Sequence, residues 1–360
     1  MKQPFYKSLA ILVLLSPIAF IASGHAQTAG AHRGTTDRLA KQTFERQKFP
    51  GLAVGVLHKG ELTYLGYGYS DIAQKIPIDP RYSKFRIGSV SKPLTAAALM
   101  RLVERDVIDL DASITKYYSK FPRKGWEITS RQLAGNMSGI RHYRGGSEPW
   151  TNISYPSVSE GLSIFKNDPL EHKPGIKFTY STYGWSLLSA VMEGAAKSEF
   201  LPLMDSEVFK PLKMKNTSAE FRNRIYEKSV TFYRPGGEIW PPVDNSYKWA
   251  GGGFLSTAED LLLFGKAHLQ PGYLKKQSLI ALGTSQRTSE GRATNYSIGW
   301  FTHTESAGRK WIYHAGGAAG GSSMIVICPQ EQLVVVTLIN QFPAKTENLA
   351  FNIAYSYLPK

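Results

Sequence analysis

The 360-residue sequence contains one cysteine, Cys328, so no disulfide bond can form within the chain. Because Cys328 ends the apolar stretch Met-Ile-Val-Ile-Cys, we expect a packed strand residue and not a reactive thiol. The eight histidines show no His-Glu-x-x-His pair or other metal-ligand spacing. The sequence therefore predicts neither a disulfide-stabilised small fold nor a metal or other cofactor.

Acidic residues are few compared with basic ones. The chain has 28 acidic and 43 basic side chains and a formal net charge of +15. The basic residues are spread along the chain without a run of five, and they match no zinc-finger or basic-zipper pattern. Nucleic acid is therefore not an expected partner, whereas weak attraction to an anionic cell-envelope polymer is expected. The sequence carries no signal about oligomeric state.

The apolar run near the amino end is short. Leu9–Ala22 is interrupted by Pro17 and falls below the ~20 residues that a membrane-spanning helix needs. Lys2 and Lys7 precede the run and small residues follow it up to Ala26, which is the layout of a secretory signal peptide. We expect residues 1–26 to be removed and the protein to be periplasmic or secreted. An uncleaved membrane anchor is the alternative.

After a polar lead at residues 27–37, strand patterns occur at both ends of a single domain spanning residues 38–360. Residues 51–58 and 62–69 flank a Lys59-Gly60 turn, which is typical of a hairpin. Further strands are expected at residues 296–302, 310–314, 322–328 and 333–340. Helices are expected at residues 37–47, from Ser91 onward, and at 347–357, and residues 95–290 are predicted to be mostly helical.

This order favours an α+β fold. One antiparallel sheet would be assembled from both chain ends and flanked by the terminal helices, with a mostly helical subdomain, about residues 95–290, inserted in it. The cleft between the two parts is then the expected site. The loops at residues 141–170 and 222–248 contain no motif with a recognisable chemical function, so the sequence does not predict the substrate.

The stretch Ser89-Val90-Ser91-Lys92 places a serine and a lysine three residues apart at the start of a predicted helix. Residues three apart share a helix face, so Lys92 can help take the proton of the Ser89 hydroxyl. Pro93 marks the first turn of that helix, where the backbone N–H of Ser89 is unpaired and is a candidate oxyanion donor. Two further copies of the pattern, starting at Ser113 and Ser163, lack this setting and are interpreted as surface residues.

A second cluster presents Tyr180-Ser181-Thr182 just before another predicted helix. A phenol titrates near ~10, so Tyr180 needs a neighbouring cation such as Lys92 to act as a base near neutral pH. The alternative is a packed tyrosine whose hydroxyl bonds to the backbone.

A third cluster, His314-Ala315-Gly316-Gly317, opens a glycine-rich stretch between two strands. Glycines within strands often mark a close approach of a ligand to the backbone. A flexible turn with a solvated His314 is the alternative.

Taken in order, the three clusters resemble the motif set of the penicillin-recognising serine hydrolases, and specifically the class C beta-lactamase branch with its carboxypeptidases, D-aminopeptidases and esterases. Supporting stretches include Tyr296-Ser-Ile-Gly-Trp300, and the resemblance covers about residues 38–358. It implies the beta-lactamase/transpeptidase-like fold and an acyl-enzyme cycle without a metal.

By this resemblance, Ser89 is the nucleophile, and Lys92 and Tyr180 share its proton and pass it to the leaving group. The backbone N–H groups of Ser89 and Gly317 form the oxyanion hole, and Thr182, His314 and Gly316 bind substrate.

The sequence departs from the family pattern at two positions. Thr182 stands where many members have asparagine, and His314-Ala315-Gly316 stands where antibiotic-hydrolysing members have Lys-Thr-Gly. Histidine, with a reference pKa near ~6.5, lacks the permanent charge that lysine offers to a substrate carboxylate. Efficient hydrolysis of penicillins is therefore not expected.

We expect an exported serine hydrolase that acts on an amide or ester of a small molecule or peptide, of peptidase, D-aminopeptidase, carboxypeptidase or esterase type. One alternative is a penicillin-binding-like receptor or assembly module that is acylated without turnover. Another is a basic surface-binding protein in which Ser89 has no role.

Overall fold

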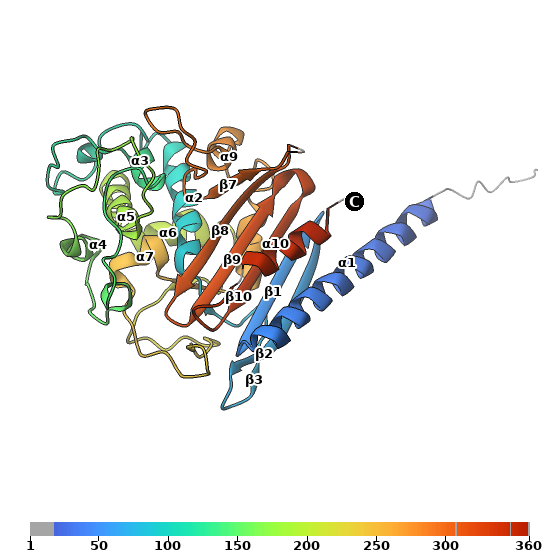
Figure 1. Ribbon diagram of the computed structural model, residues 1–360. Helices are drawn as coiled ribbons and strands as arrows, with labels where there is room; N and C mark the ends of the chain where they lie inside the picture. The colour runs from blue at the N-terminus through green and yellow to red at the C-terminus, as the bar shows by residue number, and fades with distance from the viewer. Residues whose placement is uncertain (1–17, 307, 346, 359–360) are drawn as a thin grey trace, which may run out of the picture.

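The computed structural model describes residues 18–306, 308–345 and 347–358. Its largest sheet has seven strands in the order β3-β2-β1-β10-β9-β8-β7, and each neighbouring pair is antiparallel (Figure 1). The strands of this sheet are β1 Gly51–His58, β2 Glu61–Asp71, β3 Ile76–Pro77, β7 Phe301–Thr304, β8 Lys310–Ala318, β9 Gly321–Cys328 and β10 Leu333–Ile339. A smaller sheet has the order β4-β6-β5, with β4 Phe85–Arg86, β5 Ser218–Ala219 and β6 Phe254–Ser256.

The first and last parts of the chain meet in the middle of the large sheet. Strand β1 pairs with β10, from Leu52 opposite Ile339 to His58 opposite Leu333. Both strands are almost wholly buried, because apolar side chains cover both of their faces. The predicted α+β fold, with one sheet assembled from both chain ends, is confirmed.

Helices cover both faces of the large sheet. Figure 1 shows α1 and α10 on one face and the helical part of the molecule beside α2 on the other. The helices are α1 Ile18–Gln47, α2 Ser91–Val103, α3 Ser130–Ala134, α4 Val158–Gly161, α5 Thr182–Ala196, α6 Phe200–Met204, α7 Trp249–Gly252, α8 Ala258–Lys266, α9 Lys276–Gly283 and α10 Glu347–Ser356. No helix within the described ranges is both long enough and apolar enough to span a bilayer.

Two strands and one helix of the middle and C-terminal parts differ from expectation. The strand expected from Tyr296 begins at Phe301, because residues before it turn at Gly299, whose φ is +80°. The strand expected to end at His314 continues to Ala318, since its glycines pair with β9. Helix α8 lies within the range predicted as a helical subdomain, yet it packs on β1 and β10 of the sheet.

The helix expected from Asp37 begins at Ile18, so the predicted polar lead is helical as well. His32 stacks on Tyr357 at a ring distance of 4.5 Å, and Thr36 bonds the Tyr357 hydroxyl at 3.0 Å. These contacts hold the polar segment at residues 27–37 against the C-terminal end of the chain, next to α10. Most of the predicted signal peptide lies outside the described residues, and its cleavage after Ala26 stays a prediction.

Candidate active site

Ser89 lies in a short 3-10 turn, η1 (Gly88–Val90), between β4 and α2. Its side chain is partly exposed, whereas Gly88 and Val90 are buried. Gly88 has a φ of +47°, and a Cβ there would lie 2.5 Å from the carbonyl oxygen of Gly317 on β8. Only glycine allows this turn to approach β8 so closely, and the result is an accessible serine held against a strand.

Lys92 is fully buried in the first turn of α2. Its Nζ lies 3.0 Å from Ser89 Oγ, 3.2 Å from Thr182 Oγ1 and 2.7 Å from the carbonyl oxygen of Gly251. Burial lowers the pKa of Lys92 well below its usual range, and the charge of Lys248 lowers it further. A neutral amine retains a lone pair, so Lys92 can accept the proton of Ser89.

Tyr180 comes directly before α5, whose N-cap residue Ser181 accepts a hydrogen bond from the Gly184 N–H at 2.9 Å. The Lys92 Nζ lies 4.7 Å from the centre of the Tyr180 ring. Burial raises the pKa of Tyr180, and a hydrogen bond with Ser89 offsets part of that rise. The phenol therefore stays protonated, which suits a proton donor better than the base considered from the sequence.

Thr182 opens α5 and is buried. Its hydroxyl receives one of the Lys92 hydrogen bonds, and its backbone N–H donates to His142 Nδ1 at 3.2 Å. Thr182, which is predicted to bind substrate, therefore also contacts the amine of Lys92 and helps to orient it.

The glycine-rich end of β8 runs beside the Ser89 turn. A Cβ at Gly316 would lie 2.0 Å from the carbonyl oxygen of Ile87, so this position also requires glycine. Strand β7 begins at Phe301 opposite Tyr313, so, among the described residues, positions 314–318 of β8 have no strand partner on that side. The backbone of Gly317, predicted as an oxyanion donor, therefore lies next to the turn that carries Ser89.

His314 is 1 % exposed. Its Nδ1 lies 2.6 Å from the carbonyl oxygen of Ala315 and therefore carries the proton, while Nε2 lies 3.2 Å from the Tyr296 hydroxyl. Burial lowers the pKa of His314 to about 3, with Lys92 as a second cause. The ring is neutral and both nitrogens are bound to protein, so it offers no cation to a substrate carboxylate.

The site includes His142 and Tyr143, which lie in a loop whose sequence contains no motif with a recognisable chemical function. The His142 ring packs edge-on against Tyr180 at 5.5 Å, and its backbone carbonyl accepts a hydrogen bond from Arg141 at 2.9 Å. No motif in the sequence singled out either residue.

A second lysine, Lys248, is buried in the turn that precedes α7. Its Nζ donates to the carbonyl oxygen of Pro149 at 2.7 Å and lies near the rings of Tyr143, Trp150 and Tyr247. Burial, followed by the charge of Arg86, lowers the pKa of Lys248 to about 7. No motif in the sequence singles out this lysine.

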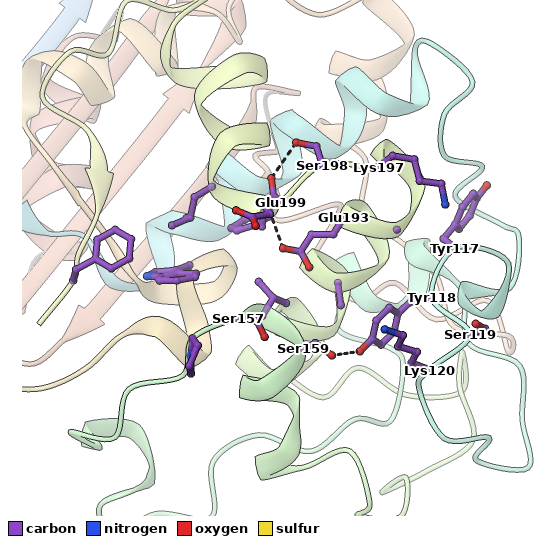
Figure 2. A pocket seen from close by; sticks show the side chains of 18 residues that line it. Tyr117, Tyr118, Ser119, Lys120, Ser157, Ser159, Glu193, Lys197, Ser198 and Glu199 are labelled. Carbon is purple, nitrogen blue, oxygen red and sulfur yellow. Dashed lines mark hydrogen bonds between the residues drawn. The ribbon is translucent and has the colours of Figure 1, made fainter.

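A separate hollow of about 680 Å³ lies toward the C-terminal end of α5. Figure 2 shows Glu193 and Lys197 at this hollow, together with Tyr118, whose hydroxyl lies 2.7 Å from that of Ser159. Ser89, Lys92 and Tyr180 are not among its lining residues. The site at Ser89 is therefore recognised by its chemistry and not by the size of a cavity.

The Beta-lactamase family profile matches residues 36–356. The chain belongs to the beta-lactamase family. The resemblance drawn from the three ordered clusters around Ser89, Tyr180 and His314 is therefore confirmed.

This beta-lactamase-family chain is 31 % identical to the mitochondrial serine beta-lactamase-like protein LACTB of Homo sapiens, over 82 % of the chain and 72 % of that protein. Its fold is similar to an octameric penicillin-binding protein homologue from Pyrococcus abyssi, with a TM-score of 0.77, 22 % identity, and coverage of 89 % and 76 %. It is also similar to a D-stereospecific amidohydrolase from Streptomyces sp., with a TM-score of 0.74, 21 % identity, and coverage of 89 % and 97 %.

Proposed function

We propose that this serine hydrolase cleaves an amide or ester through an acyl-enzyme in which Ser89 is the nucleophile. The observation that carries the proposal is the contact of 3.0 Å between Lys92 Nζ and Ser89 Oγ, made by a buried amine with a lowered pKa. Lys92 takes the Ser89 proton as the Oγ attacks the carbonyl carbon of the substrate.

The protonated Tyr180 completes the cycle. Its phenol donates a proton to the leaving group as the tetrahedral intermediate collapses, and is reprotonated from Lys92, whose amine lies over its ring. The backbone N–H groups of Ser89 and Gly317 stabilise the oxyanion. Water then attacks the acyl-enzyme, releases the acid and regenerates Ser89.

The proposed substrate is a small peptide or ester without an essential carboxylate at the His314 position. The neutral, internally bonded His314 ring supports this choice, because it supplies no charge there. The fold shared with a D-stereospecific amidohydrolase makes amides of D-amino acids the first compounds to try.

Covalent labelling tests the nucleophile. A fluorophosphonate probe should modify the purified protein, and peptide mass mapping should place the label on Ser89. Ser89→Ala should abolish labelling, whereas the matched variant Ser113→Ala, in another Ser-x-x-Lys copy, should label at the wild-type rate. A label that persists in Ser89→Ala would overturn the assignment.

Turnover distinguishes an enzyme from an acylated receptor. Purified protein would be assayed against p-nitrophenyl esters, D-amino-acid amides and a chromogenic cephalosporin. We expect sustained product release from an ester or amide and little from the cephalosporin. A burst that stops after one equivalent would instead support a module that is acylated without turnover.

We also propose that the protein is exported, on the basis of the signal-peptide layout before Ala26. Amino-terminal sequencing of protein recovered from the periplasm or medium should begin at Gln27. Recovery of the chain only from the cytoplasm would contradict this.

A further inference from the structure

Three contacts hold the His142 ring and its backbone. The Thr182 N–H donates to its Nδ1 at 3.2 Å, its carbonyl oxygen accepts from Arg141 at 2.9 Å, and its ring packs on Tyr143 at 4.3 Å. A side chain fixed in this way on a helix start and a packed loop is pre-organised for binding.

The hydrogen bond from Thr182 also determines which ring nitrogen carries the proton. A backbone N–H can only donate, so Nδ1 must be the acceptor and Nε2 must carry the hydrogen in the neutral ring. Burial lowers the pKa of His142 to about 4, and the charge of Lys92 adds to this effect. The neutral form with Nε2–H therefore prevails at neutral pH.

The Nε2–H group is accessible to solvent. It has no hydrogen-bond partner within the part of the chain that the structure describes, and it is not among the fully enclosed unpaired atoms. The ring itself lies 5.5 Å from that of Tyr180, beside the groups proposed to transfer protons.

We propose that His142 is a substrate-binding residue whose Nε2–H donates a hydrogen bond to a carbonyl oxygen adjacent to the scissile bond. The ring cannot serve as the base for the deacylating water in this state, because its free nitrogen is a donor. The preferred substrates are accordingly those with an amide next to the bond that is cut. This inference rests on the proposed serine hydrolysis.

Matched substrate pairs test the proposal. On the acyl side, p-nitrophenyl N-acetylglycinate is compared with p-nitrophenyl pentanoate, which has the same chain length and no amide. On the leaving-group side, the pentanoyl thioester of N-methylmercaptoacetamide is compared with that of butanethiol. The measured quantity is the ratio of kcat/KM within each pair.

In His142→Leu, the ratio should fall about 10-fold for one of the two pairs, which is the effect of losing one hydrogen bond. That pair identifies the side on which the carbonyl oxygen is bound. Any loss from disturbed packing or from the unpaired Thr182 N–H affects both members of a pair equally. His142→Gln, which can accept from Thr182 and donate with its amide, should restore much of the ratio.

The pH dependence provides a second readout. The charged groups that face His142 are Lys92, Lys248 and Arg141, which oppose its protonation, and Glu148, which favours it. The wild-type ratio should be constant between pH 5 and 9, because the imidazole is neutral throughout. Ratios unchanged in His142→Leu for both pairs, or a wild-type ratio that titrates near pH 6.5, would overturn the proposal. Absence of all hydrolysis and of Ser89 labelling would instead overturn the proposed function.

Discussion

Among the described residues, Lys92 contacts no carboxylate that would balance a positive charge. Its partners are two hydroxyls and a backbone carbonyl, and it is fully buried. The same burial that lowers the pKa of the amine penalises its charged form in the folded protein.

This penalty predicts a pH-dependent stability. The pKa of Lys92 is lowered on folding, so above its folded-state pKa the unfolded chain binds more protons than the folded chain, and stability rises as the pH approaches the unfolded value near ~10.4. The free energy of unfolding of the wild type, minus that of Lys92→Met, should therefore increase from pH 7 to pH 9.5. Urea titrations at several pH values measure it, and a difference that stays flat or decreases would contradict the lowered pKa.

Tyr180→Phe tests the assignment of the phenol as an acid. An alkylamine leaving group needs a proton and p-nitrophenolate does not, so the loss in kcat should be larger for an amide than for a p-nitrophenyl ester. We expect a loss of ~10²- to 10⁴-fold for the amide. Stopped-assay rates on both substrates measure this, with an unchanged melting curve as the control. Equal losses on both would argue that Tyr180 acts only on Ser89.

At the scale of elements, β8 and the Ser89 turn are in direct backbone contact. A methyl group at Gly316 would lie 2.0 Å from the carbonyl oxygen of Ile87, so Gly316→Ala must push the strand away from the turn. We expect ~10²- to 10³-fold slower acylation, comparable to the loss of one oxyanion donor. Gly184→Ala is the matched control, since a Cβ there meets only ordinary contacts of 3.6 Å or more. Fluorophosphonate labelling rates of both variants provide the measurement, and similar rates would contradict the close approach.

The turn into α7 brings a second positive charge toward Lys92. The pKa of Lys248 is about 7, so it is charged below neutral pH, and its charge lowers the pKa of Lys92. In Lys248→Met the pKa of Lys92 should rise. The acidic limb of the pH–activity profile should therefore shift to higher pH by roughly 0.5–1 unit. The pH profile of kcat/KM measures the shift. Lys266→Met, which removes an exposed charge on α8, should leave the profile in place.

Sequence reasoning succeeded where a short pattern determines local structure. Pro93 and the apolar residues after it predicted the start of α2, and Lys59-Gly60 predicted the β1–β2 hairpin. It failed where the structure depends on distant partners. The glycines of β8 are poor strand formers on their own, and they form a strand because β9 pairs with them.

The same limit applies to the site. Ser89, Lys92 and Tyr180 carry reactive groups in ordered motifs, so their proximity could be predicted. His142 and Lys248 could not, because an imidazole in a loop and a lysine in a turn acquire a role only through burial and the neighbours that tertiary folding provides.

At the scale of the whole molecule, α1 lies along the sheet and meets the C-terminal helix through His32 and Thr36. A chain beginning at Gln27 keeps these contacts, so its melting temperature should match that of the full chain. A chain beginning at Asp37 loses them and should melt lower, by roughly 2–4 °C for each kcal/mol lost. Thermal unfolding of the two truncations measures the difference. Equal melting temperatures would show that the lead contributes nothing to stability.

The pairing of β1 with β10 has a consequence for biosynthesis. Leu52 finds its partner Ile339 only after all the residues between them have been made. At about 5–20 residues per second, roughly a quarter of a minute to a minute passes between the synthesis of the two strands. During that interval the apolar strand β1 has a hairpin partner on one side and an open edge on the other. The nascent chain therefore stays incompletely folded until β10 has been made, a state in which chaperones can bind it.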